Sequence, residues 1–237
     1  MEIISKEEFE LKVAPLFHNG LIEKVSITKE HDHIFISRKY DYLKIVSNPY
    51  SQWFDIEPLD FQQALANASK IMGDDFIYLS FVGYITEPDI PMHFKFPVGE
   101  LLIKDVSELK GEAEAYTNEI YLSHFLIYSP QGLWAALLEM DCFGTIGMSK
   151  DFYTLTKSIY PQLDEELDTQ LFDFIRWCND SPHVPDEWEY IPGDNTGCTG
   201  WCRGLMEHLC RRDITPEDEE LDDNVDLIAI YRNIKVA

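Results

Sequence analysis

The residues best suited to metal or thiol chemistry lie near the C-terminus: Cys198, Cys202, His208 and Cys210. Zinc binds four thiolate or imidazole ligands in a tetrahedron, and closely spaced cysteines supply two ligands from one turn. The spacing is incomplete as a paired-cysteine motif. On one helix Cys202 and Cys210 would also face one side and His208 another. We therefore expect no cofactor and buried free cysteines, with a structural zinc site as the alternative.

Other catalytic patterns are weaker. Cys202 lies near the start of an expected helix over residues 201–211, where the helix dipole favours a thiolate nucleophile, but no convincing His and Asn pair follows it. His31 and His33 share a face if extended, yet no third metal ligand is close in sequence. His124 lies in an apolar run and is expected to be a core histidine. The sequence contains no phosphate-loop, Gly-x-Ser-x-Gly or His-Glu-x-x-His motif.

The charge is the most unusual property of the chain. Its 43 acidic and 19 basic residues give a net charge of −24, and residues 119–237 hold 23 of the acids and 8 of the bases. Such a surface repels nucleic acid and anionic membranes and attracts basic proteins by salt-sensitive steering. Solubility alone is the other explanation for this composition.

The densest acidic stretch runs over residues 213–226 and contains no Lys or Arg. We expect its carboxylates to be the first contact surface for a basic partner, and the two aromatic residues of the Pro/Gly-rich loop over residues 181–200 to be the second. These residues are Asp213, Glu217, Asp218, Glu219, Glu220, Asp222, Asp223 and Asp226, with Trp188 and Tyr190.

Length and composition indicate a folded cytoplasmic protein. A chain of 237 residues can form a single domain, 1–237, with a possible subdivision into a sheet-centred core, 1–160, and a helical extension with an acidic loop, 161–237. No apolar run approaches the ~20 residues of a membrane span. The N-terminus is acidic where a secretion signal would be basic and then apolar. Five cysteines, an odd number, favour reduced thiols.

The pattern of elements predicts an α+β fold with a mostly antiparallel central sheet flanked by helices. Strand-like runs occupy residues 21–28, 33–38, 42–47 and 76–86, and the first three are expected to form a meander. Helical stripes cover residues 5–17, 61–72, 149–160 and 164–178, with Ser5, Asp60, Ser149 and Asp164 as expected N-caps. Residues 87–99, rich in proline, are expected to be an irregular loop.

The stretch Tyr121–Met148 is expected to form the buried centre of the sheet. Its two apolar runs flank Pro130 and Gly132, which is the pattern of a hairpin with a short loop. Too many of its residues are apolar for one face to meet water.

This stretch and the helix after it resemble the closing segment of bacterial polymorphic-toxin immunity proteins, including those of contact-dependent growth inhibition. The likeness rests on Tyr128-Ser129, then Gly132 and Trp134, on Glu139 and Asp141, on Gly144 with Ile146-Gly147, and on the capped helix with Phe152. It covers about 30 residues and its motif is generic.

The resemblance implies a non-enzymatic inhibitor that binds a cognate toxin domain, often a basic nuclease. This agrees with the charge, since an acidic face can occupy a surface that binds phosphates. The alternatives are a zinc-binding or thiol enzyme, or a metal-stabilised interaction module, each using the Cys198–Cys210 cluster.

Overall fold

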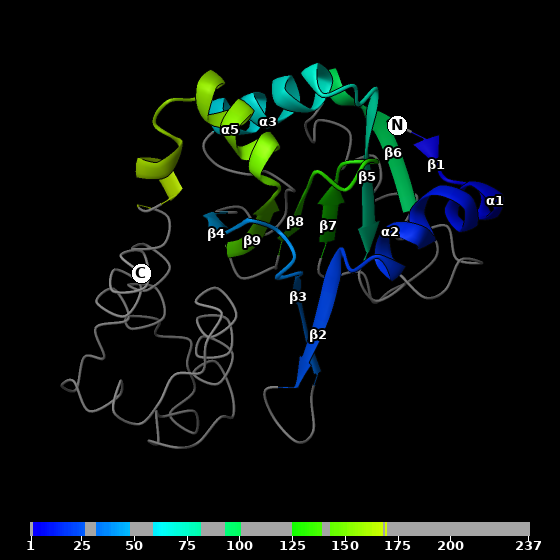
Figure 1. Cartoon of the computed structure of the whole chain (residues 1–237). Coiled ribbons are helices and arrows are strands. Elements are labelled where there is room, and N and C mark those ends of the chain that lie inside the picture. Colours follow the sequence, from blue (N-terminus) through cyan, green and yellow to red (C-terminus); the bar gives the residue numbers. More distant parts are fainter. Residues whose placement is uncertain are drawn as a thin grey trace.

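The computed structural model of the chain describes residues 2–26, 32–47, 59–81, 93–100, 125–138, 143–167 and 169. Its centre is a seven-stranded sheet in which every neighbouring pair is antiparallel (Figure 1). In spatial order the strands are β1 (Glu2–Ile3), β6 (His93–Pro97), β5 (Phe76–Phe81), β7 (Phe125–Tyr128), β8 (Trp134–Leu138), β9 (Phe143–Met148) and β4 (Tyr42–Ser47). Together with the helices, this confirms the α+β prediction.

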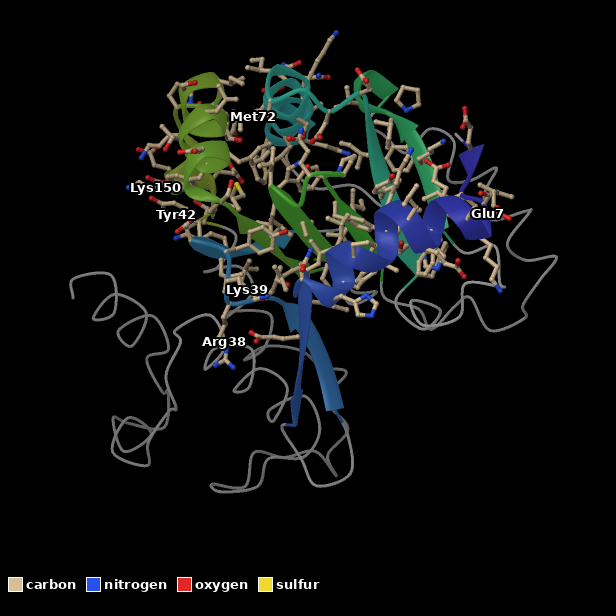
Figure 2. The ribbon with its side chains drawn as sticks, turned by 45° about the vertical axis from the view of Figure 1, so that its right-hand side comes forward. Glu7, Arg38, Lys39, Tyr42, Met72 and Lys150 are labelled. Carbon is tan, nitrogen blue, oxygen red and sulfur yellow. The ribbon has the colours of Figure 1, made fainter. Side chains whose placement is uncertain are left out.

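A second ladder pairs β2 (Ile22–Ser26) with β3 (Asp32–Ile36), and the two strands project from the main sheet in both overall views (Figures 1 and 2). The helical elements are α1 (Lys6–Glu8), the π-helical η1 (Phe9–Val13), α2 (Ala14–His18), α3 (Leu59–Ile71), the short 3-10 turn η3 (Val98–Glu100) and α5 (Lys150–Ile159). Within the part of the chain described, no helix is long and apolar enough to cross a membrane.

Helices α3 and α5 cover one face of the sheet, where most buried side chains are apolar and Gln62, Ser69 and Thr156 of the two helices are buried among them. Phe61 and Leu65 of α3 and Phe152 of α5 are fully buried against strand residues such as Ile77 and Trp134. The Trp134 and Phe152 rings stack with centroids 5.9 Å apart. The indole Nε1 of Trp134 donates a 2.7 Å hydrogen bond to Ser69 Oγ on α3, so the polar edge of the ring is satisfied inside this layer.

The other face is covered by the N-terminal segment, residues 2–18, and by the base of the β2–β3 ladder. Phe9 and Val13 of η1 are buried there with Ile36 of β3. Because strand side chains alternate between faces, Tyr78 and Tyr128 point to this side while Ile77 and Ile127 point to the α3 side.

Two glycines allow the close contacts around β9. A Cβ on Gly147 would lie 2.5 Å from Ile36 Cγ2 and 2.4 Å from Tyr40 Cδ2, so only glycine lets the segment between β3 and β4 reach the sheet. A Cβ on Gly144 would lie 2.3 Å from the Leu137 carbonyl oxygen of β8. Gly144 and Gly147 thus have a packing role.

The expected hairpin Tyr121–Met148 is present as β7 and β8, joined by a turn in which Gly132 has a φ of +67°. The second apolar run forms two strands, β8 and β9, which pair with each other in the sheet. Strand β5 is described as Phe76–Phe81, and the rest of its expected run lies outside the described residues. Buried residues in all three central strands support the prediction that this stretch forms the middle of the sheet.

Two topological expectations were wrong. The meander stops after β3, since β4 pairs with β9 at the far edge of the main sheet. The proline-rich stretch contains β6, with Pro97 at its last position, where a missing N–H costs least.

The helix-end predictions were partly correct. Ser5 and Ser149 are N-caps: Ser5 Oγ accepts from Glu8 N at 3.2 Å, and Ser149 Oγ accepts from Phe152 N at 3.4 Å. Asp60 lies inside the first turn of α3, which starts at Leu59. Asp164 lies inside a helical turn that starts at residue 163, so it is not the expected cap.

Candidate functional site

A buried polar cluster lies on the sheet under the N-terminal segment. Ser80 of β5 is paired in register with His93 of β6, and Tyr128 of β7 comes from the strand on the other side of β5. Ser80 Oγ lies 2.8 Å from Tyr128 Oη and 2.9 Å from His93 Nδ1. The three residues are at most 2% exposed. We call Ser80, His93 and Tyr128 the polar triad.

A serine hydroxyl within hydrogen-bond distance of an imidazole, beside a third polar group, is the geometry of an activated nucleophile. Burial decides against that role for the polar triad, because Ser80 is 0% exposed and the His93 ring lies 4.2 Å from the Phe9 ring of η1. Burial also raises the pKa of Tyr128 far above its ordinary range, and the hydrogen bond to Ser80 opposes this only in part. The polar triad therefore joins three strands by buried hydrogen bonds.

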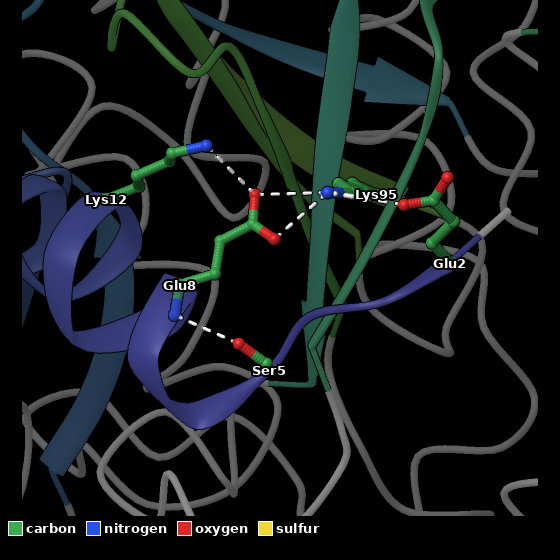
Figure 3. Close-up of polar contacts among 5 residues, drawn as sticks. All are labelled: Glu2, Ser5, Glu8, Lys12 and Lys95. Carbon is green, nitrogen blue, oxygen red and sulfur yellow. Dashed lines mark hydrogen bonds and ion pairs between the residues drawn. The ribbon is translucent and has the colours of Figure 1, made fainter.

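An ion-pair cluster holds the N-terminal segment over the edge of the sheet (Figure 3). The Glu8 carboxylate accepts two hydrogen bonds from Lys95 Nζ of β6, at 2.9 and 3.1 Å, and one from Lys12 at 3.2 Å. Glu2 also lies 3.2 Å from Lys95. The hydrogen bond with Lys95 lowers the pKa of Glu8, and the hydrogen bond with Glu8 raises the pKa of Lys95.

Tyr78 lies on the same face of the sheet. Burial, with the nearby Glu8 carboxylate, raises the pKa of Tyr78 to about 12. Among the described residues none forms a hydrogen bond with its hydroxyl. An unsatisfied buried hydroxyl costs about 1–3 kcal/mol, so this cost partly offsets the gain from burying the Tyr78 ring.

A surface groove of about 270 Å³ opens beside the end of α2. Four segments line it, through Leu16, Asn19, Gly20 and Leu21, then Lys39, Tyr40 and Asp41, then Gln131 and Gly132, and finally Ser149. Its lysine is engaged internally, since Lys39 Nζ donates a hydrogen bond to the Asn19 carbonyl. A Cβ at Gly20, whose φ is +78°, would lie 2.6 Å from that ammonium nitrogen.

Two further polar groups of the groove, Asp41 and Gln131, also bind neighbouring segments. Asp41 Oδ2 accepts from the Lys150 backbone N–H at 2.7 Å, at the start of α5. Gln131 Nε2 donates to Asp74 Oδ1 at 2.9 Å, and Ser129 Oγ donates to Asp74 Oδ2 at 2.8 Å. Burial raises the pKa of Asp74, while these two hydrogen bonds oppose the shift. The groove is a junction where side chains fasten loops together.

The residues predicted from the sequence as sites lie outside the described residues. These are the Cys198–Cys210 cluster with His208, the carboxylates of residues 213–226, Trp188, Tyr190, His31 and His124. Within the described ranges there is no group of three or more His, Cys, Asp or Glu side chains placed to hold a metal ion. The metal, thiol and partner-surface hypotheses therefore stay predictions.

Sequence reasoning missed the polar triad. One signal was present: Ser80 is the only polar residue in an otherwise apolar strand run, and a buried hydroxyl requires a partner. Its partners, His93 and Tyr128, lie 13 and 48 residues away in the chain. No local pattern connects residues so far apart.

Charge is distributed unevenly between the described residues and the rest. The described residues contain fifteen Asp or Glu and ten Lys or Arg, whereas the remaining residues contain 28 and nine. The sheet and its helices are thus close to neutral. Most of the net charge of −24 belongs to the other segments of the chain.

Comparison with known proteins found no matching family model, no matching curated protein and no matching solved structure.

Proposed function

We propose that this protein is a non-enzymatic inhibitor of the immunity type, which binds and neutralises a cognate basic toxin domain such as a nuclease. The observation that carries the proposal is the net charge of −24, with eight carboxylates and no Lys or Arg in residues 213–226. A local field of one sign attracts an oppositely charged partner and raises the association rate.

The architecture supports this proposal in one further respect. The sheet is covered on both faces, and the described polar clusters serve internal contacts. Such a body can hold attached segments in place without taking part in chemistry itself. In the proposal, the tract over residues 213–226 makes the first contact, and Trp188 and Tyr190 supply aromatic anchors.

The test compares two variants with the same change in net charge. In the tract variant, Glu217, Asp218, Glu219 and Glu220 are replaced by Ser. In the control variant, four exposed carboxylates of the described body are replaced by Ser, namely Glu7, Glu10, Asp151 and Glu165. Each protein is used to capture partners from cells of the source organism at low and at high salt, and association rates are measured with the captured partner.

The proposal predicts a basic partner retained at low salt whose toxicity is suppressed when this chain is co-produced. The tract variant should associate about tenfold or more slowly at low salt, and the control variant should change much less. Equal effects of the two variants would remove the tract from the interface. If no basic partner is retained at low salt and co-production suppresses no toxin, the inhibitor proposal fails.

A further inference from the structure

The two outer strands of the main sheet differ in how they end it. On one side the sheet ends in β1, which has two residues and whose Glu2 forms an ion pair with Lys95 of β6. On the other side it ends in β4, whose six residues pair one-to-one with β9 and include no proline. Short strands, exposed charges, prolines and bulges are the usual devices that keep an edge from pairing further. Strand β4 has none of these devices, since its one charged residue, Lys44, is only 9% exposed.

Strand β4 is also buried more completely than an edge strand that faces water. Ile45 is 1% exposed and Val46 is 0% exposed, with their backbone atoms included. Successive residues of an antiparallel strand turn their backbone N–H and C=O groups to opposite sides, so one of these two neighbours turns its groups away from β9. Buried backbone groups need hydrogen-bond partners. No described strand lies on that side of β4, and because the burial arises within a single chain, the partner is a segment of the same chain.

The chain leaves the described part on the same side of the sheet. After α5, Leu167 is buried in the core cluster that also contains Val46 of β4. Tyr153 of α5 connects the two regions, because its hydroxyl donates a hydrogen bond to Asp164 and its ring stacks on Tyr42 of β4 with centroids 3.7 Å apart. Figure 1 shows the chain turning to this side after α5. The residues that follow therefore start beside β4.

These following residues contain a strand-like run over residues 227–231, with the sequence Leu-Ile-Ala-Ile-Tyr. The patterns over residues 164–178 and 201–211 are those of helices, so they do not supply a strand for β4. Roughly 60 residues separate Leu167 from the run, and at about 3.3 Å per extended residue they can reach any point along a strand of about 20 Å. Chain length and starting point thus both permit the run to return to β4.

We propose that residues 227–231 pair with the outer edge of β4 and form an eighth strand of the main sheet. Main-chain hydrogen bonds supply the pairing, as in other cases of strand addition at a sheet edge. The acidic tract over residues 213–226 then ends directly at this edge of the sheet. The pairing requires no other protein, so it stands apart from the proposed inhibitor function.

The experiment is a proline scan in the full chain, with Ile228→Pro, Ala229→Pro and Ile230→Pro as single variants. Proline removes one backbone N–H. In an edge strand, alternate N–H groups face the neighbouring strand, and proline is tolerated at the positions whose N–H faces water. The readout is residue-resolved amide hydrogen exchange of β4 measured by nuclear magnetic resonance, with the amides of β8 as the internal reference. Asn224→Pro, outside the run, is the matched control.

In the wild type and in Asn224→Pro, the β4 amides that face away from β9 should be protected from exchange. Ile228→Pro and Ile230→Pro should act alike and Ala229→Pro in the opposite way. One of these two classes should speed exchange of the outward β4 amides about tenfold or more, while the other class and the β8 amides stay near wild type.

Three results would overturn the proposal. The first is rapid exchange of the outward β4 amides in the wild type, which needs no variant to fold. The second is an equal effect, or no effect, of all three prolines in the run. The third is protection of these amides that falls on dilution, because this would assign the edge of β4 to a second copy of the chain.

Discussion

The contact between Trp134 and Ser69 gives the sharpest prediction about what holds α3 on the sheet. Both side chains are 0% exposed and joined by a 2.7 Å hydrogen bond. Ser69→Ala would leave the indole N–H buried without an acceptor, which costs about 1–3 kcal/mol. Trp134→Phe would leave the Ser69 hydroxyl without its donor and a cavity beside Phe152. We expect it to cost about 2–4 kcal/mol.

The double variant separates the hydrogen bond from the packing. Once one partner is gone, the second change no longer strands a buried polar group. The double variant should therefore be more stable than the sum of the two losses implies, by about 1 kcal/mol or more. Urea denaturation followed by far-ultraviolet circular dichroism is the suitable assay, because the chain contains five tryptophans whose fluorescence would mix.

An exposed serine provides the control. Ser158→Ala on α5 removes a hydroxyl of the same size from a solvent-exposed position, and it should change stability by no more than about 0.5 kcal/mol. If the Ser69 and Trp134 losses add within about 0.3–0.5 kcal/mol, or if Trp134→Phe costs less than about 1 kcal/mol, the hydrogen bond does not stabilise this layer as argued.

Three further variants test other contacts. Gly147→Ala should lose about 1–3 kcal/mol by urea denaturation, because its Cβ would lie 2.5 Å from Ile36 Cγ2; no loss would mean that the strands shift freely. Ser149→Ala should cost about 1 kcal/mol through the lost N-cap of α5, seen as a lower Tm; an unchanged Tm would contradict the cap. Glu8→Gln should cost about 0.5–1 kcal/mol at pH 7 through the lost pair with Lys95. Because that pairing lowers the pKa of Glu8, the difference from wild type should shrink as pH falls below 4.5, and a difference that stays constant down through this range would rule the pair out.

Much of the local structure could be predicted because its causes are local. The serine caps precede their helices by one residue, and Gly73, with a φ of +94°, ends α3 where the periodic stripe stops. The central hairpin was found because two apolar runs flank a turn containing Gly132. These signals lie within a few residues of the features that they specify.

Pairings between distant strands could not be predicted in the same way. Strand β4 carries the same alternating pattern whether it continues a meander with β3 or pairs with β9. Gly147 leaves room on the face of β9 for Ile36 and Tyr40, so the chain between β3 and β4 can cross the sheet there. The reason for this glycine becomes visible only once its neighbour in space is known.

The two faces of the sheet explain why its polar residues were the hardest to interpret. On the α3 face, a hydrophobic stripe on the helix and apolar positions on the strands suffice to predict the contact. On the other face, Ser80, His93 and Glu8 are each unremarkable in sequence and gain meaning only from partners on other elements. The ion pair between Glu8 and Lys95 on this face depends on protonation, because the hydrogen bond with Lys95 lowers the pKa of Glu8. Acid that protonates Glu8 should therefore loosen the contact between the N-terminal segment and β6.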